Sequence, residues 1–430
     1  MKGDVPTAAW RRNLLAGQGA ARVASDKALA SLARPFRSAE SQARADAALD
    51  AKTADRIFEV LSRLRGSALK VAQFFSMETD LVSPEMAKRL RQTCDRVPMM
   101  NSAFVRTEVR RALGHSPNRM FVQFDHKAMA AASIGQVHAA TTHDGRSVVV
   151  KVQYPGIEQT IINDMRTLSR LIRLTSNSSY LLSLVDEVKA RLLEECDYHL
   201  EAEQLAWFAA HGQIEGVSTP EPVPELSSSR VLTMTRMSGE PLCEWLQGDP
   251  SQAQRERVAG RVHQVFVDAI RRHGRLHADS NPGNFLFTDD KVSVLDFGCV
   301  RALSEDYRDL VLRLWRTFAH PEPSELWSLY EQMGLFKNMP THEAEAMEAE
   351  HLLPFREWLA EPLRVERFDF GADPDFISRG RDLFFSFIKH RAHLGLRSEF
   401  VLVNRALFGM YRLFEQLGAR VSLREAWLES

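Results

Sequence analysis

Residues 276–298 combine acidic and amide side chains at a spacing that suits chemistry on a phosphate group. Asp279 and Asn284 form a D-x-x-x-x-N segment, a short apolar run follows, and Asp296 then begins the tripeptide Asp-Phe-Gly. Phosphoryl transfer from ATP needs acidic and amide oxygens around Mg²⁺, and a carboxylate near the accepting oxygen. This order of residues therefore predicts a catalytic loop followed by a Mg²⁺-binding turn.

The alternative to a phosphoryl-transfer site is a polar loop followed by an ordinary β-hairpin. The tripeptide Asp-Phe-Gly is too short to separate the two interpretations. The whole stretch, however, has the order and spacing of a protein-kinase catalytic loop and its Asp-Phe-Gly turn. We therefore favour phosphoryl transfer.

Lys151 lies in an apolar run, residues 147–153, that predicts a β-strand. A lysine on such a strand must be paired or must point to polar surroundings. In kinases a strand lysine of this kind holds the α- and β-phosphates and pairs with a glutamate on a helix. A solvent-facing lysine is the alternative, and the later Asp-Phe-Gly motif favours a lysine that contacts phosphates.

Residues 130–138, AAASIGQVH, lie between two predicted strands, where a nucleotide-binding loop is expected. A glycine-rich loop would bring main-chain N–H groups onto the phosphates. Alanines replace most of the glycines here, which reduces backbone freedom. A plain tight turn is the alternative.

A run of carboxylates, from Glu194 to Glu203, falls within a predicted helix. On a helical period Glu194, Asp197 and Glu201 share one face, while Glu195 lies well around from it. A solvated acidic face is the usual explanation of such a run. A buried Lys151 would need one of these carboxylates as its partner.

Two further residue pairs have helical spacing. Lys70 and Gln73 lie on one face of the helix predicted over residues 54–77. His273 and His277 have no further metal-ligand pattern around them, so we interpret both as structural.

The composition narrows the class of protein. With 430 residues the chain is long enough for two or three domains, and its net charge of -1 gives no indication of nucleic-acid binding. The four cysteines are scattered, which argues against a zinc site or disulfide framework and fits a reducing compartment. No run of 18 apolar residues predicts a membrane-spanning helix. We therefore expect a cytoplasmic protein, with a peripheral contact on the inner membrane surface as an option.

The first 40 residues differ from the rest, because arginine and lysine outnumber acidic residues and alternate with apolar ones. A basic amphipathic segment of this kind can lie on an anionic membrane surface. A frayed terminus without a function is the alternative.

The elements that must position these residues follow from the hydrophobic periodicity. Helices are predicted over residues 54–77, 83–94, 102–113, 157–175, 181–211, 240–273, 374–394 and 398–417. Strands are predicted over residues 120–125, 136–142, 147–153, 230–237, 285–287 and 292–296. Asp144-Gly145 predicts a hairpin turn between the second and third strands. A sheet-bearing half followed by a helical half suits a two-lobed α+β architecture.

Taken together, these motifs resemble the UbiB/AarF atypical kinase-like family, which includes ubiquinone-biosynthesis kinases of bacteria and mitochondria. The similarity covers roughly residues 64–303, and the motifs occur in the family's order. The matching motifs are KxGQ at Lys70–Gln73, the alanine-rich loop at Ala130–His138, the strand lysine Lys151, the ExD element with its following glutamate at Glu195–Glu201, HxDxxPGN at His277–Asn284 and DFG at Asp296–Gly298.

The resemblance implies a two-lobed protein-kinase-like fold with an N-terminal helical extension and a largely helical C-terminal lobe. The expected domains are a basic segment over 1–50, the extension over 51–118, an N-lobe over 119–239 and a C-lobe over 240–430.

The resemblance also implies a role for each matching residue. Asp279 would be the catalytic base, and Asn284 and Asp296 would hold Mg²⁺. The nucleotide-binding set would be Ala130, Ala131, Ala132, Ser133, Lys151, Glu195, Asp197 and Glu201. Lys151 would pair with Glu201. Lys70 and Gln73 would act from a helix that folds over the site, with Lys70 meeting Glu195 and Asp197.

Two departures from the family pattern stand out. Ala72 replaces the glycine of KxGQ, and Ser280-Asn281 replaces the usual Pro-His of the catalytic loop. Neither removes a metal ligand or the base. Both allow a changed substrate or a relaxed N-terminal gate.

The main hypothesis is an atypical kinase or ATPase that uses ATP (or ADP) and Mg²⁺ and supports isoprenoid-quinone or lipid metabolism. Its partners would be a nucleotide and a small lipid or quinone precursor, and the sequence specifies no oligomeric state. A nucleotide-binding pseudoenzyme that acts as a switch or scaffold is the second hypothesis. The third is a small-molecule kinase of the aminoglycoside or choline type, whose catalytic loop also reads H-x-D-x-x-x-x-N.

Overall fold

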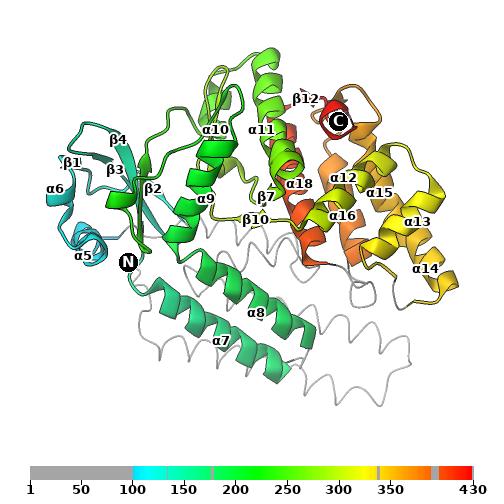
Figure 1. Ribbon diagram of the computed structural model, residues 1–430, viewed down its shortest axis with the longest axis horizontal. Helices are drawn as coiled ribbons and strands as arrows, with labels where there is room; N and C mark the ends of the chain where they lie inside the picture. Colours follow the sequence, from blue (N-terminus) through cyan, green and yellow to red (C-terminus); the bar gives the residue numbers. More distant parts are fainter. Residues whose placement is uncertain (1–99, 133, 176–178, 337–338, 389–396, 429–430) are drawn as a thin grey trace, which may run out of the picture. The chain divides into compact units, whose positions relative to one another are not determined.

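The computed structural model describes residues 100–428, except residues 133, 176–178, 337–338 and 389–396. The basic segment and the two helices predicted before residue 95 lie outside the described residues. The described chain forms two compact units (Figure 1). The first contains residues 100–200 and 223–234, and the second contains residues 201–222 and 235–428.

The first unit is built on a five-stranded sheet. Its strands are β1 (Gln123–Phe124), β2 (Ala130–Ala131), β3 (Gly135–Thr141), β4 (Ser147–Gln153) and β6 (Val231–Thr235). They follow the order β1-β3-β4-β6, with β2 paired to β3. The β3–β4 hairpin turns at Gly145, whose φ of +85° suits glycine, so the predicted hairpin is confirmed.

The helices of the first unit are α5 (Ser102–Leu113), α6 (Pro117–Met120), α7 (Ile157–Thr175) and α8 (Ser179–Glu194). Helix α5 begins at Asn101, whose side chain accepts the Ala103 N–H, and packs its buried Val105 and Val109 into the core formed with β4. Helices α7 and α8 lie beside each other (Figure 1).

The helix predicted over residues 181–211 is wrong as a single element, because the chain forms α8 and then α9 (Tyr198–His211). The Tyr198 N–H donates to the Ser229 carbonyl at 3.0 Å, and Asp197 Oδ1 accepts the His199 N–H at 3.0 Å. Aspartate favours such a helix start. The predicted acidic face is therefore also wrong, since Glu194 and Glu201 belong to different helices.

The helix predicted over residues 240–273 likewise divides into α10 (Leu242–Gln247) and α11 (Gln252–His273). Asp249 has a φ of +51°, and Pro250 follows it. Proline lacks the N–H that a helix interior needs. Ser251 then starts α11 with a capping box that uses Gln254.

The second unit is mostly helical. After α11 its main helices are α12 (Glu305–Ala319), α13 (Pro323–Gln332), α14 (Thr341–Met347), α15 (Leu353–Ala360), α16 (Phe376–Ile388), α18 (Ser398–Leu417) and α19 (Arg424–Leu428). Its core is strongly aromatic; the Trp358 and Phe408 rings, for example, stack at 4.9 Å. The predicted α+β class, with a sheet-bearing unit and a helical C-terminal region, is confirmed.

The strands of the second unit are short and form three small sheets. They are β5 (Val217–Ser218), β7 (Arg275–His277), β8 (Phe285–Phe287), β9 (Val292–Val294), β10 (Val300–Ala302), β11 (Phe368–Asp369) and β12 (Arg420–Val421). β7 pairs with β10, β9 lies between β5 and β8, and β11 pairs with β12. Among the described helices of both units, none combines the length and apolar character needed to cross a bilayer.

Candidate functional site

Two short ladders in the second unit bring the predicted catalytic loop and Asp-Phe-Gly turn together. In one ladder His277 of β7 faces Val300 of β10, and in the other Phe285 of β8 faces Val294 of β9. Residues 278–284 and 295–299 join the two ladders, and the Ala278 N–H donates to the Cys299 carbonyl at 2.9 Å. The loop and the turn therefore lie side by side in the second unit.

Hydrogen bonds within the loop orient Asn284. Its Nδ2 donates to the main-chain carbonyl of Asp279 at 3.2 Å. A carbonyl oxygen only accepts, so the amide nitrogen must face it, and this orientation directs Oδ1 of Asn284 away from that bond. Asn281 accepts the Gly283 N–H at 3.0 Å and starts the 3₁₀ turn Pro282–Asn284. This single loop conformation thus fixes the positions of both Asp279 and Asn284.

The Asp-Phe-Gly turn is held on both sides of Asp296. Its Oδ1 accepts the Gly298 N–H at 2.8 Å, and its main-chain carbonyl accepts a hydrogen bond from His277 Nε2 at 2.7 Å. His277 is buried and therefore acts as a structural donor to the turn. The Leu295 N–H also donates to the Asn284 carbonyl at 2.8 Å, which links the turn to the loop.

Helix α9 places Glu201 against the same turn. The Phe208 ring of α9 contacts buried Phe297 with ring centroids 4.8 Å apart. A Cβ built on Gly298 would lie 3.2 Å from Asp296 Oδ1 and 3.9 Å from Glu201 Oε2. The carboxylates of Glu201 and Asp296 thus border the same glycine, although Glu201 is far from Asp296 in the sequence. The second unit therefore gathers four of the predicted site residues: Glu201, Asp279, Asn284 and Asp296.

Lys151 lies on β4 of the first unit and is only 6% exposed, which excludes a solvent-facing lysine. Its Nζ lies 5.5 Å from the centroid of the buried Tyr198 ring, within the range of a cation–π interaction. Because side chains alternate along a strand, Lys151 projects from the face opposite Val150 and Val152, which pack on α5.

The alanine-rich segment forms the tight β2–β3 hairpin. Ala130 and Ala131 are exposed, and the Ala132 N–H donates to the Gly135 carbonyl at 2.9 Å. A Cβ on Gly135 would lie 2.3 Å from the Val152 carbonyl oxygen, so only glycine lets the hairpin approach β4 this closely. Ser133 lies outside the described residues.

His138 follows this hairpin on β3 and is fully buried. Its Nδ1 donates to the Asp125 carbonyl at 2.9 Å, and its ring stacks on Phe124. Burial lowers the pKa of His138. His138 is therefore a neutral support for the hairpin at neutral pH.

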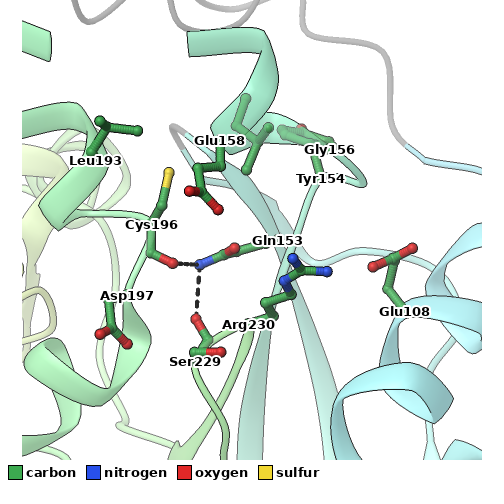
Figure 2. A pocket seen from close by; sticks show the side chains of 11 residues that line it. Glu108, Gln153, Tyr154, Gly156, Glu158, Leu193, Cys196, Asp197, Ser229 and Arg230 are labelled. Atoms are coloured by element: carbon green, nitrogen blue, oxygen red, sulfur yellow. Dashed lines mark hydrogen bonds between the residues drawn. The ribbon is translucent and has the colours of Figure 1, made fainter. Parts of the chain in front are cut away.

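A cavity of about 280 Å³ opens in the first unit beside Asp197 (Figure 2). Gln153 Nε2 lies at its edge and donates to the carbonyls of Cys196 and Ser229, at 2.6 Å and 3.1 Å. These bonds fix the segment that carries Asp197 into α9. Glu195 lies in the turn just before this segment, and its N–H donates to the Arg191 carbonyl.

Two of the predicted site residues, Lys70 and Gln73, lie outside the described residues. The proposed meeting of Lys70 with Glu195 and Asp197 stays a prediction. So does the pairing of Lys151 with Glu201, since the two residues belong to different units.

The ABC1 atypical kinase-like domain matches residues 92–328 of this chain, a segment that contains both the Lys151 strand and the Asp-Phe-Gly turn. The chain belongs to the ABC1 atypical kinase-like family. The family resemblance seen in the motifs is thereby confirmed.

Two known atypical kinases are moderately similar to this chain in sequence. The mitochondrial atypical kinase coq-8 of Caenorhabditis elegans is 30% identical over 87% of this chain and 50% of its own length. The mitochondrial atypical kinase COQ8 of Saccharomyces cerevisiae is 29% identical over 69% of this chain and 60% of its own length. The chain thus spans between half and three fifths of these relatives.

A solved structure shares the fold of this ABC1-family chain. The complex of Rv3197 with erythromycin from Mycobacterium tuberculosis matches with a TM-score of 0.63 and 26% identity, over 90% of this chain and 98% of that one. The match extends well beyond the ABC1 domain itself, and therefore includes C-terminal helices.

Two residues that position the site had no motif in the sequence. Gln153 acts through main-chain carbonyls and Tyr198 through a ring contact. The one available signal for Gln153 is its place two residues after Lys151, on the same face of β4.

Proposed function

We propose that this ABC1-family chain is an ATP- and Mg²⁺-dependent atypical kinase or ATPase of the UbiB type. The observation that supports this most strongly is the hydrogen-bonded loop and turn of the second unit. There Asn284 is bonded to the Asp279 main chain, and Asp296 is fixed by Gly298 and His277. Oriented carboxylate and amide groups are what phosphoryl transfer requires of a protein.

In this proposal Asn284 and Asp296 hold Mg²⁺, and Asp279 is the catalytic base. Mg²⁺ prefers oxygen ligands and is commonly bound through one or two carboxylates together with substrate phosphates. The donor set fits, because the Asn284 amide nitrogen is engaged with Asp279 and its oxygen points elsewhere. The bound cation would neutralise charge on the phosphates.

Lys151 and Glu201 are two further charged residues of the proposed nucleotide site. Lys151 would contact the phosphates and pair with Glu201, and burial of both side chains supports a paired arrangement over a solvated one. The β2–β3 hairpin, with Ala130, Ala131, Ala132 and Ser133, would cover the nucleotide. Its small side chains allow close approach to the main chain.

The remaining roles follow the family pattern. Lys70 would meet Glu195 and Asp197, and the helix that carries Lys70 and Gln73 would restrict access to the site. The acceptor class would be an isoprenoid-quinone precursor or another small lipid. The basic segment 1–40 would supply a peripheral membrane contact.

The decisive experiment is hydrolysis of Mg-ATP by the purified chain, with and without anionic liposomes, for the wild type and Asp296→Asn. The proposal expects hydrolysis that liposomes increase and that Asp296→Asn abolishes. Asp289→Asn is the matched control, because Asp289 is exposed in the β8–β9 turn. Unchanged Mg-ATP affinity in Asp296→Asn would contradict the metal role.

A second candidate is a nucleotide-binding switch without turnover. The hairpin favours it, since alanines replace the glycines that normally bring N–H groups onto phosphates. Nucleotide binding that depends on Asp296, without hydrolysis in any condition, would support this candidate.

A small-molecule acceptor is a third possibility to test with the same protein. The solved relative is described as an erythromycin complex, so a macrolide belongs in a screen of soluble alcohols. Transfer of phosphate to such an alcohol would favour this candidate over a lipid acceptor.

A further inference from the structure

Gly409 lies in the interior of α18, where glycine is unfavourable because it costs backbone entropy. A Cβ built on Gly409 would lie 3.1 Å from Ser280 Cβ and 3.5 Å from the Ser280 carbonyl carbon and oxygen. The catalytic loop therefore packs directly on the helix backbone at this point. Close packing against Ser280 thus explains the glycine at position 409, and the sequence of α18 alone does not reveal this contact.

Helix α18 cannot easily move away from the loop. Its residues Ala406, Met410 and Leu413 are completely buried. Figure 1 shows α18 beside α11, and contacts between the two helices agree with that view. A side chain added at position 409 must therefore be accommodated by a displacement of the loop.

Ser280 is the residue through which such a movement would reach the site. It is buried and lies between Asp279, whose carbonyl accepts from Asn284, and Asn281, whose side chain accepts the Gly283 N–H. A displacement of Ser280 would shift both ends of this hydrogen-bonded loop. Asp279 and Asn284 would then move together.

We propose that Gly409 is a positioning residue for the catalytic loop, acting through its contact with Ser280. This inference rests on the proposed function for its effect on hydrolysis, but the contact itself has an independent readout. Gly409 lies outside the matched segment 92–328. Helix α18 is thus part of the machinery that sets the loop geometry.

The test compares Gly409→Ala with the swap Ser280→Gly/Gly409→Ala in the full chain. The swap moves a Cβ from one side of the contact to the other and removes the 3.1 Å approach. Two readouts are followed: hydrogen exchange of the amides in residues 278–285, and the rate of Mg-ATP hydrolysis. Far-UV circular dichroism checks the fold.

Gly409→Ala should raise exchange in residues 278–285 and lower kcat by about tenfold, because small displacements of catalytic groups have large effects on rate. The swap should recover at least half of the lost rate and protection. Ser280→Ala/Gly409→Ala should recover neither, since alanine keeps the Cβ at position 280. If Gly409→Ala does not fold, the proposal is supported equally when the swap folds and Ser280→Ala/Gly409→Ala does not.

Gly260→Ala is the matched control, because Gly260 lies inside α11 and a Cβ there would meet nothing within 4 Å. Exchange and kcat for Gly409→Ala equal to those of Gly260→Ala would overturn the proposal. So would a swap that is no better than Ser280→Ala/Gly409→Ala. A wild type that does not hydrolyse ATP, with the exchange pattern as expected, would reject the proposed function and leave the positioning role supported.

Discussion

The side-chain amide of Gln153 donates a hydrogen bond of 2.6 Å to the main-chain carbonyl of Cys196. This bond joins the strand that carries Lys151 to the segment that carries Asp197 (Figure 2). A second bond from the same nitrogen reaches Ser229, which also accepts the Tyr198 N–H. One buried amide thereby organises three segments of the first unit.

Replacement of Gln153 by leucine should destabilise the first unit. Gln153 is only 5% exposed, and leucine has no donor for the carbonyls of Cys196 and Ser229. We expect the free energy of unfolding to fall by about 1–3 kcal/mol, as for a buried acceptor that loses its donor. Urea unfolding measures this change, and hydrogen exchange at Cys196 and Tyr198 should rise.

Gln159→Leu is the control for this prediction. Gln159 is exposed on α7, and its amide donates to Asn163 on the same helix. Its replacement should change stability by less than about 0.5 kcal/mol. Equal effects of the two variants would show that the bonds to Cys196 and Ser229 contribute nothing.

Local hydrophobic patterns predicted several strands and helices of the fold correctly. The predicted strand 147–153 and helices 157–175 and 398–417 coincide with β4, α7 and α18. Each of these segments has a clear hydrophobic period, which depends only on neighbouring residues. The predicted strand 285–287 likewise coincides with β8, and the strand predicted over 292–296 forms β9 over 292–294.

The break between α8 and α9 could not be found by periodicity. It depends on the Tyr198 N–H bonding to Ser229, a residue of another segment. Similarly, Gly409 reads as a weak position in a helix until its contact with Ser280 is known. Motif order predicted which residues form the loop and turn, but not Gly409, which packs on the loop from α18.

Lys151→Met tests the proposed phosphate contact. Methionine keeps the apolar stem but removes the cation, so we expect the dissociation constant for Mg-ATP to rise at least about tenfold. Titration calorimetry measures the affinity. Lys291→Met is the control, because Lys291 is exposed beside β9. An unchanged affinity in Lys151→Met would exclude a phosphate contact.

Glu256→Gln tests an ion-pair network that joins α11 to the β11–β12 region. The Glu256 carboxylate lies 2.7 Å from both Arg367 and Arg420, and its side chain is only 10% exposed. Burial opposes its ionisation, but hydrogen bonds from Gln252 and Arg420 and the two arginine charges prevail and lower the pKa of Glu256. At pH 7 the variant should lose about 1 kcal/mol of stability.

The sign of the pH dependence follows from the lowered pKa of Glu256. A carboxylate with a lowered pKa stabilises the fold above its ordinary value of about 4.3, and the effect is lost as pH falls through the folded-state pKa. The stability gap between wild type and Glu256→Gln should therefore close in acid. Glu361→Gln removes an exposed pair with Arg379 and should cost less than about 0.5 kcal/mol. A gap that stays constant between pH 7 and 3 would contradict the ionic interpretation.

His263 on α11 should make the fold sensitive to mild acid. The residue is buried against the rings of Phe414 and Trp427, and burial lowers the pKa of His263 to about 3. In the unfolded chain histidine binds its proton near pH 6.5. Below that pH the unfolded state therefore holds one more proton than the folded state, and stability falls by up to about 1.4 kcal/mol per pH unit.

His263→Leu removes the imidazole that binds this proton and places an apolar side chain in the same core. The wild-type stability minus that of the variant should be constant above pH 6.5 and should decrease steadily from there towards pH 4, because only the wild type gains a proton on unfolding. Urea unfolding at half-unit pH steps gives both curves. His342→Leu replaces an 82% exposed side chain and should leave the wild-type pH profile in place. Parallel curves for wild type and His263→Leu would mean that His263 is protonated inside the folded chain, and that the packing of α11 against α18 tolerates a buried charge.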